Sequence, residues 1–331
     1  MKRELNWKRL LPSPQTLSFV GLMLLCLAVF GILKPAYATP NNLYAIVLSA
    51  CLSAVLALSM GVVISAGGFD LCIGHTAGFA ALMCGYFLRT AGMDSWPAML
   101  LALLMAILIG AVNGFLVSKM GISSFIVTLG MQFVLVGVRQ WITVGNSYRA
   151  SSVLKGIAQG SVLGISNLIL ISAAMLALVG FVMQKTAFGR KMQFTGANIV
   201  ASDYSGIPTK LYTFLAFLIS GAIAGVVGIL QFAKLTSATI NMGDGWLFNA
   251  MTIAVFSSVI FGRFKAHGIA LVALLLTMIT TGINMLGVSS AWTNFVLGLI
   301  LLMSLFAGKY LKFNTGKCKK GSVSHGCEKA V

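Results

Sequence analysis

Asp70 is the acidic residue whose place in the sequence most strongly suggests a chemical role. It ends the motif Gly67-Gly68-Phe69-Asp70 and lies between apolar runs, so we expect it at membrane depth. An uncompensated carboxylate there costs at least about 2.5 kcal/mol, so it needs polar partners. Asp70 could line a polar path, or it could cap the helix that starts just after it by accepting backbone N–H bonds. The cap is the favoured role.

Small and polar residues in or beside other apolar runs are further candidates for such a path. Amide side chains offer donors and acceptors to a hydroxyl-rich solute, although hydrogen bonding between helices explains each of them equally well. Glycine permits irregular backbone at membrane depth, which persists only where it is buried or faces a water-filled cavity. The path candidates are Gly67, Gly68, Asp70, Asn113, Asn249 and Asn284. Arg139, near the end of another apolar run, is expected to extend to the membrane surface.

Catalytic and metal-binding patterns are not recognisable in the sequence. The histidines His75, His267 and His325 do not form a metal-ligand spacing, and Cys318, His325 and Cys327 are too scattered in the tail to favour one. No Ser-His-Asp or Cys-His arrangement stands out. We therefore expect no catalytic residue, no metal and no cofactor, and we do not expect an enzyme.

The composition indicates which elements must position these residues. Of 331 residues, 58% are hydrophobic and 9% are charged, and the mean hydropathy is +0.96. A soluble fold of this length needs many more charged residues to cover its surface, so the chain is a polytopic membrane protein in contact with lipid. The 23 Lys and Arg residues against 6 Asp and Glu could suggest nucleic-acid binding. They lie in short stretches between apolar runs, however, so no nucleic acid is expected as a partner.

Apolar runs that are long enough to cross a bilayer lie at about 17–35, 43–66, 96–118, 124–145, 163–184, 209–233, 269–286 and 291–308. Shorter runs lie near 73–88 and 248–262. If both also cross, both termini share one side with most of the basic residues, and that side is the cytoplasm. We expect an all-α fold with about ten transmembrane helices in 17–308, a cytoplasmic segment 1–16 and a basic cytoplasmic tail 309–331. The first run also resembles a signal peptide, but its length favours an uncleaved anchor.

Two pairs of similar motifs indicate an internal repeat of opposite orientation. Gly121-Ile122-Ser123-Ser124 and Gly287-Val288-Ser289-Ser290 each precede a predicted span. Gly67-Gly68-Phe69-Asp70 and Gly243-Asp244-Gly245-Trp246 each lead into one of the short runs. An odd number of spans separates the members of each pair. The sequence therefore predicts two inverted-topology repeats with short broken helices.

The longest polar interruption inside the chain runs from Lys185 to Pro208 and is expected on the cytoplasmic side. Gly189, Gly196 and Gly206 divide it into turns around one short helix. A plain solvated loop would contain more charge, so we expect a helix that docks a soluble partner.

This segment, together with the rest of the chain, resembles the permease subunits of ATP-binding-cassette (ABC) importers for ribose and related monosaccharides. The pattern T-x-F-G-R, G-x-N and S-G-I is formed by Thr186, Phe188, Gly189, Arg190, Gly196, Asn198, Ser205, Gly206 and Ile207. The resemblance continues through Gly67 to Leu71 with Gly74, Asn113-Gly114-Phe115, Phe125 to Gly130, and Leu286 to Ser290 with Trp292.

The resemblance implies a non-catalytic, multi-pass subunit of the bacterial inner membrane that imports a monosaccharide or a similar small polar solute. The implied partners are a cytoplasmic ABC ATPase, a periplasmic solute-binding protein, and a second copy of this chain or a homologous permease. The chain has no G-x-x-x-x-G-K-[ST] phosphate loop of its own. The implied ATPase-docking residues are Phe188, Gly189, Arg190, Gly196, Asn198, Ser205 and Gly206.

The solute and the energy source each leave an alternative open. Relatives often have acidic residues where this chain has Leu247 and Asn249, which weakens the assignment of ribose itself. The alternative function is a secondary transporter driven by an ion gradient. Such carriers usually need intramembrane ionisable groups, and Asp70 is the one carboxylate expected at that depth.

Overall fold

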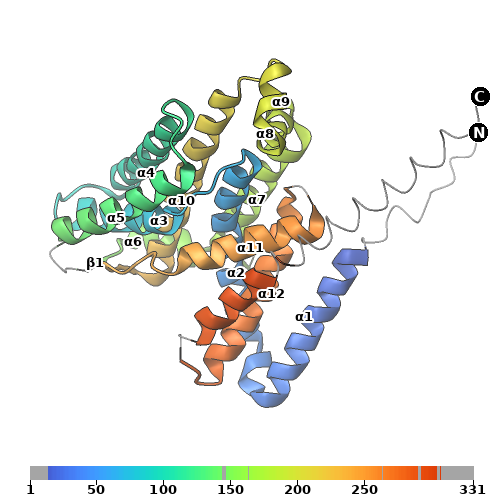
Figure 1. Cartoon of the computed structure of the whole chain (residues 1–331). Coiled ribbons are helices and arrows are strands. Elements are labelled where there is room, and N and C mark those ends of the chain that lie inside the picture. The colour runs from blue at the N-terminus through green and yellow to red at the C-terminus, as the bar shows by residue number, and fades with distance from the viewer. Residues whose placement is uncertain are drawn as a thin grey trace, which may run out of the picture.

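The computed structural model is an assembly of helices and describes residues 14–143, 147–162, 164–262, 264–289, 292–303 and 306 (Figure 1). Residues 1–13 of the predicted N-terminal segment and all of the predicted tail 309–331 lie outside the described residues. Residues 14–16 already belong to the first helix.

The helices follow in the order α1 (Pro14–Leu33), the 3-10 helix η2 (Pro35–Ala38), α2 (Pro40–Ser65), α3 (Ile73–Arg89), α4 (Ser95–Ser118), α5 (Ser124–Thr143), α6 (Ser152–Gln159), α7 (Asn167–Lys185), α8 (Ala187–Ala197), α9 (Ile199–Tyr204), α10 (Thr209–Leu235), α11 (Trp246–Phe261), α12 (Ala266–Met285) and a last helix, Trp292–Met303. Short antiparallel pairs join β1 (Tyr148–Arg149) to β4 (Ser237–Ala238) and β2 (Ser161–Val162) to β3 (Ile165–Ser166).

Within the described residues, seven helices are long and apolar enough to cross a membrane: α1, α2, α4, α5, α7, α10 and α12. The two short runs of the sequence are the helices α3 and α11, and the described part of the run 291–308 is the short apolar helix Trp292–Met303. The prediction of an all-helical, multi-pass membrane protein is therefore confirmed. The count of about ten spans stays a prediction.

Two long helices, α2 and α10, form the centre of the molecule and pack against each other (Figure 1). On either side of this pair the neighbours differ: α10 packs against α3 and α4, whereas α2 packs against α11 and α12. The α1 helix lies at the edge, against α12. The central pair thus holds α3, α4, α8, α11 and α12 directly, whereas α5 packs on α3 and α4.

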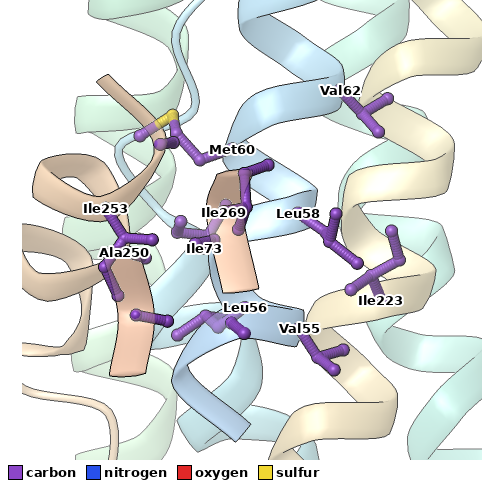
Figure 2. Packing of buried hydrophobic residues seen from close by; sticks show 14 of the residues in the cluster. Val55, Leu56, Leu58, Met60, Val62, Ile73, Ile223, Ala250, Ile253 and Ile269 are labelled. Carbon is purple, nitrogen blue, oxygen red and sulfur yellow. The ribbon is translucent and has the colours of Figure 1, made fainter. Parts of the chain in front are cut away.

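The interior of this arrangement consists of branched aliphatic side chains. Figure 2 shows Val55, Leu58 and Val62 of α2 on the side of Ile223 of α10, and Ile253 of α11 on the other side of α2. Between helices in a membrane, such contacts stabilise by van der Waals packing because lipid tails are as apolar as leucine.

Glycines allow α4 and α10 to approach most closely. A Cβ on Gly110 would lie 2.5 Å from the Phe217 carbonyl oxygen, and a Cβ on Gly221 would lie 2.5 Å from the Ala106 carbonyl oxygen. No side chain fits at either position without separating the helices. This small-residue seam fixes the distance between α4 and the central helix α10.

The polar segment after α7 differs from the prediction of one short helix. It contains two, α8 and α9, because Asn198 leaves helical geometry (φ −161°, ψ 103°) and starts a new helix. Figure 1 shows both at one end of the bundle, beyond the end of α7.

Candidate functional site

The α8–α9 segment is fixed at its start by hydrogen bonds at two helix caps. The Thr186 hydroxyl donates to the Val182 carbonyl oxygen (2.6 Å) and accepts from the Gly189 N–H (3.3 Å), which joins the last turn of α7 to the first of α8. The Asn198 Oδ1 accepts from the Ala201 N–H (3.0 Å) and caps α9. The residues of the sequence pattern therefore set where each helix begins.

The inner face of α8 packs directly onto the backbone of two membrane helices. A Cβ on Gly189 would overlap the backbone of Met183, and a Cβ on Gly196 would overlap the carbonyl oxygen of Ser65 and lie 2.7 Å from the nitrogen of Gly67. Gln193 Nε2 also donates to the Met183 carbonyl oxygen (2.7 Å). The α8 helix is thus in backbone contact with the ends of α7 and α2.

The outer face of the same segment exposes apolar side chains. Val200 is 63% exposed and Tyr204 is 91% exposed, and Phe194 and Ile199 are also exposed. The same segment contains a groove of about 280 Å³ that is lined by Phe194, Ala197, Asn198, Ala201, Ser202, Ser205 and Ile207. Exposed apolar side chains gathered on one segment are typical of interaction surfaces.

The predicted docking residues fall into different places within this segment. Asn198 and Ser205 line the groove, and exposed Arg190 donates to the Lys185 carbonyl oxygen (3.1 Å). Phe188 packs inward, with its ring 5.5 Å from that of Tyr212. The glycines Gly189 and Gly196 are packing positions, and Gly206 has a left-handed φ of 75° in the turn after α9.

Sequence reasoning missed the exposed apolar residues Phe194, Ile199, Val200 and Tyr204 of this face. The signal that could have found them is a set of large apolar residues inside an otherwise polar interruption.

Asp70 lies buried at the start of α3, in a group of polar side chains from three helices. Its Oδ1 accepts from the Cys72 N–H (3.1 Å) and from Cys72 Sγ (3.0 Å), and its Oδ2 accepts from the Ser220 hydroxyl (2.8 Å). Asn113 Nδ2 donates to Cys72 Sγ (3.0 Å), and the Thr76 hydroxyl lies 3.5 Å from the same sulfur. We call these five residues the Asp70 cluster.

The Asp70 cluster contains two of the six path candidates, Asp70 and Asn113, and two more lie in the loop before it. Gly67 and Gly68 belong to the loop that ends at Asp70, and Asn113 comes from α4. Asp70 does not form the expected cap, because Cys72 is the N-cap residue of α3 and no described side chain accepts from the first turn of that helix. Its carboxylate instead accepts from the Cys72 N–H and from Ser220 of α10, a partner that the sequence did not indicate. Asn113 Oδ1 is buried and has no hydrogen-bond partner among the described residues. A lining role for the cluster stays a prediction.

The other two path candidates lie elsewhere. Asn249 of α11 borders a cavity of about 30 Å³ together with Ser53 and Gln231, and its buried Oδ1 has no partner among the described residues. A polar cavity of this size can hold an ordered water. Asn284 is exposed near the end of α12, where its Oδ1 accepts from the Thr293 hydroxyl (3.0 Å).

Arg139 does not extend to the membrane surface as expected, because it is 2% exposed. Its Nη1 donates to the Met242 carbonyl oxygen (2.5 Å), and its Nη2 contacts Asp244 Oδ1 (3.2 Å) and His75 Nδ1 (2.8 Å). A buried guanidinium is stable only when it is paired and hydrogen-bonded. The sequence gave no indication of these partners because they lie far from Arg139 along the chain.

The docking segment and the Asp70 cluster both lie within the part of the chain that matches a known protein family. The family described as "Branched-chain amino acid transport system / permease component" matches residues 42–305. The chain belongs to this family. It is accordingly a permease component, a non-catalytic, multi-pass protein of the inner membrane.

Several curated proteins resemble this permease along most of its length. The fructose import permease protein FruF of Bifidobacterium longum is 34% identical over 72% of this chain and 69% of its own. The ribose import permease protein RbsC of Escherichia coli is 29% identical over 87% of this chain and 91% of its own. The probable ABC transporter permease protein y4mJ of Sinorhizobium fredii is 27% identical over 91% of each chain. These similarities favour the ATP-driven importer over the ion-gradient alternative.

Proposed function

We propose that this permease is the membrane-spanning subunit of an ABC importer for a monosaccharide or a similar small polar solute. The names of the fructose and ribose permeases support the solute class, and that of y4mJ supports the ABC type. The observation that carries the proposal is the two-sided α8–α9 segment, whose inner glycines contact the permease while its outer side chains remain uncovered.

The outer face of α8–α9 is the docking surface for the cytoplasmic ATPase. Val200 and Tyr204 project from α9, and the groove beside them combines apolar walls with the Asn198 amide and the Ser205 hydroxyl. An apolar centre with a few polar groups is the usual composition of a specific protein interface. Asn198 and Ser205 therefore act at the surface, whereas Gly189 and Gly196 act by holding the helix in place.

The inner face of α8 gives the ATPase a mechanical route to the Asp70 cluster. Gly196 contacts the backbone of Ser65 and Gly67, and Gly67 begins the loop that ends at Asp70. No flexible side chain lies between these segments to absorb a displacement. A movement of the docked ATPase would therefore shift the loop before α3 directly, and the chain itself needs no phosphate-binding site.

Ten spans in two inverted repeats account for the packing around the central helices. If α2 corresponds to α10, α3 to α11 and α4 to α12, then the packing of α10 on α3 and α4 is matched by that of α2 on α11 and α12. The glycines of the paired motifs share a left-handed backbone, at Gly121 (φ 72°) and Gly287 (φ 77°) and at Gly67 (φ 87°) and Gly243 (φ 99°). Short broken helices in matching halves are typical of transport proteins.

A second copy of this permease, or a homologous permease, covers the exposed face of α5. Gly130 and Gly137 lie one heptad apart, and no described atom lies within 4 Å of a Cβ built on either one. Gln140 is exposed on the same helix. Small residues allow close helix approach, and an exposed amide is better satisfied by protein than by lipid tails. The solute path would then run along this junction, with the periplasmic binding protein at the opposite end from α8 and α9.

Replacing Val200 with aspartate tests the docking proposal, because Val200 is exposed and the change leaves the permease packing intact. Val162→Asp is the matched control, since Val162 is 54% exposed but belongs to β2. We expect Val200→Asp to lower the ATP hydrolysis that co-purifies with the permease at least about tenfold, while Val162→Asp retains it. Equal ATPase recovery and solute uptake in both variants would overturn the docking assignment.

A further inference from the structure

The segment 239–245, between β4 and α11, is an irregular turn that lies against a side-chain-free face of α3. Gly243 and Gly245 have left-handed φ values of 99° and 79°. A Cβ on Gly78 would overlap the Met242 carbonyl oxygen, and a Cβ on Gly74 would lie 2.8 Å from that of Gly243. The two glycines of α3 form a flat surface against which this segment rests.

Arg139 provides the hydrogen bonds that join this segment to the helices, as far as the described residues show. The other hydrogen bonds of 239–245 stay within the turn or lead into α11, such as Met242 N–H to the Thr239 carbonyl oxygen and Trp246 N–H to that of Gly243. Arg139 comes from α5, and its guanidinium reaches the Met242 carbonyl and the Asp244 carboxylate at once. The planar guanidinium of an arginine can donate to two acceptors on one turn at once, which the single ammonium of a lysine does less well.

The ion pair within this arrangement is asymmetric. Arg139 is 2% exposed, whereas the side chain of Asp244 is 51% exposed. If the segment moves away, water can replace the partners of Asp244 at little cost. Arg139 would still contact His75 Nδ1, which accepts from the guanidinium when the imidazole proton is on Nε2. The cost of opening therefore lies on the Arg139 side, because the buried guanidinium keeps the His75 contact while its Nε has no partner among the described residues.

We propose that Arg139 is the positioning residue of a gate formed by segment 239–245, and that Asp244 is the partner whose release opens it. In the closed state, the backbone of segment 239–245 packs on Gly74 and Gly78, and the ion pair of Asp244 with Arg139 holds the turn next to α5. Open, the gate uncovers the face of α3 that carries Gly74 and Gly78, which is the opposite side of the helix from Cys72 and Thr76 of the Asp70 cluster. The role of this gate in transport rests on the proposed function. Its opening does not, because it can be measured without ATP, solute or transport.

Thiol labelling at position 242 tests the gate, since Met242 is 5% exposed. The full-length Met242→Cys permease is placed in lipid nanodiscs, treated with a charged, membrane-impermeant maleimide, and followed by peptide mass spectrometry. Buried native Cys84 of α3 reports general unfolding within the same molecule. Asp244→Asn is the decisive variant, because it removes the charge at a half-exposed position without disturbing the core.

We expect Asp244→Asn to speed labelling at position 242 about tenfold without changing labelling at Cys84. Asp244→Glu should restore the slow rate, and Asp94→Asn, at another exposed aspartate, should leave it slow. Arg139→Gln combined with Asp244→Asn should label no faster than the faster single variant, because both changes break one contact.

Three results would overturn the gate. Labelling at position 242 could be unchanged by Asp244→Asn, or it could rise only in parallel with Cys84, which would show that the pair holds the whole bundle. The labelling rate of the double variant could also rise by the product of the two single-variant increases, which would show that Arg139 and Asp244 act separately. If the Arg139→Gln permease does not fold, the labelling rate of the Asp244→Asn variant decides whether the gate exists.

Discussion

Gly196 of α8 touches Gly67, the residue that begins the loop to α3, through backbone atoms alone. The Cα of Gly196 lies 3.2 Å from the point that a Cβ on Gly67 would occupy, and a Cβ on Gly196 would lie 2.7 Å from the Gly67 nitrogen. The proposed docking segment and the proposed path are therefore in van der Waals contact, although more than a hundred residues separate them in the sequence.

Substituting Gly196 with alanine should detach α8 from the end of α2. The added methyl group meets backbone atoms that cannot rotate away, so either α8 or the loop must move. We expect loss of solute-stimulated ATP hydrolysis in the reconstituted complex and a lower unfolding temperature for the permease. Gly156→Ala is the control, because no described atom lies within 4 Å of its Cβ position in α6. If Gly196→Ala keeps full solute-stimulated ATP hydrolysis, this contact does not couple the ATPase to the solute path.

Substitutions at Asp70 should separate its two possible roles. Asp70→Ala leaves the Cys72 N–H and the Ser220 hydroxyl without their buried acceptor, at a cost of about 1–3 kcal/mol in the free energy of unfolding. Asp70→Asn keeps one acceptor oxygen and should cost less. Thermal unfolding in detergent measures both, and uptake assays show whether transport follows stability. Transport lost from a stable Asp70→Asn permease would favour path lining over a structural role in the buried hydrogen bonds of the Asp70 cluster.

Removing the Asn198 amide should weaken α9 without affecting α8. Loss of an N-cap costs about 0.5–2 kcal/mol, and α9 spans only Ile199–Tyr204, so Asn198→Ala should leave the docking surface poorly ordered. We expect reduced ATPase co-purification with normal insertion into the membrane. Asn198→Asp retains the acceptor and should preserve binding. Hydrogen exchange over 199–204 provides the direct measurement, and unchanged protection in Asn198→Ala would show that the cap is dispensable.

A cysteine at position 137 should cross-link two copies of the permease. Gly137 is exposed on α5, where the structure leaves space for a neighbouring helix. Gly137→Cys in native membranes should yield a disulfide-linked dimer on mild oxidation, detectable on a non-reducing gel. Gly21→Cys on α1 is the control, since its Cβ position is equally open but lies on a helix at the edge. Equal cross-linking at both positions would indicate random collision.

The sequence predicted features that depend on local chemistry. Long apolar runs became helices, because that depends on residues close together in the chain. The cap expected from Asp70 did not form, since its carboxylate bonds the Cys72 N–H and Ser220 and not the first turn of α3. The glycine and asparagine positions of the α8–α9 pattern were also identified, although the pattern could not show that Gly196 packs inward while Asn198 lines a groove.

Partners that are distant in sequence were not predictable from one chain. Ser220 contacts Asp70 across 150 positions, and Asp244 contacts Arg139 across 105. Arg139 was expected at the membrane surface because it lies near the end of an apolar run, from where a long side chain can reach the interface. The close spacing of Gly74 and Gly78 on α3 was a readable sign of a tight contact, but it did not show that the contact would be a loop backbone.

The two faces of α8 and α9 separate what holds the segment from what a partner would touch. Exposed residues such as Val200 and Tyr204 can change together with the partner surface without disturbing the packing of the permease, whereas Gly189 and Gly196 cannot change without moving α8. Transporters that share this architecture could therefore exchange or diversify their ATPases by altering a few surface positions. For the same reason, replacing the exposed residues of α8 and α9 is a way to make one permease bind the ATPase of another.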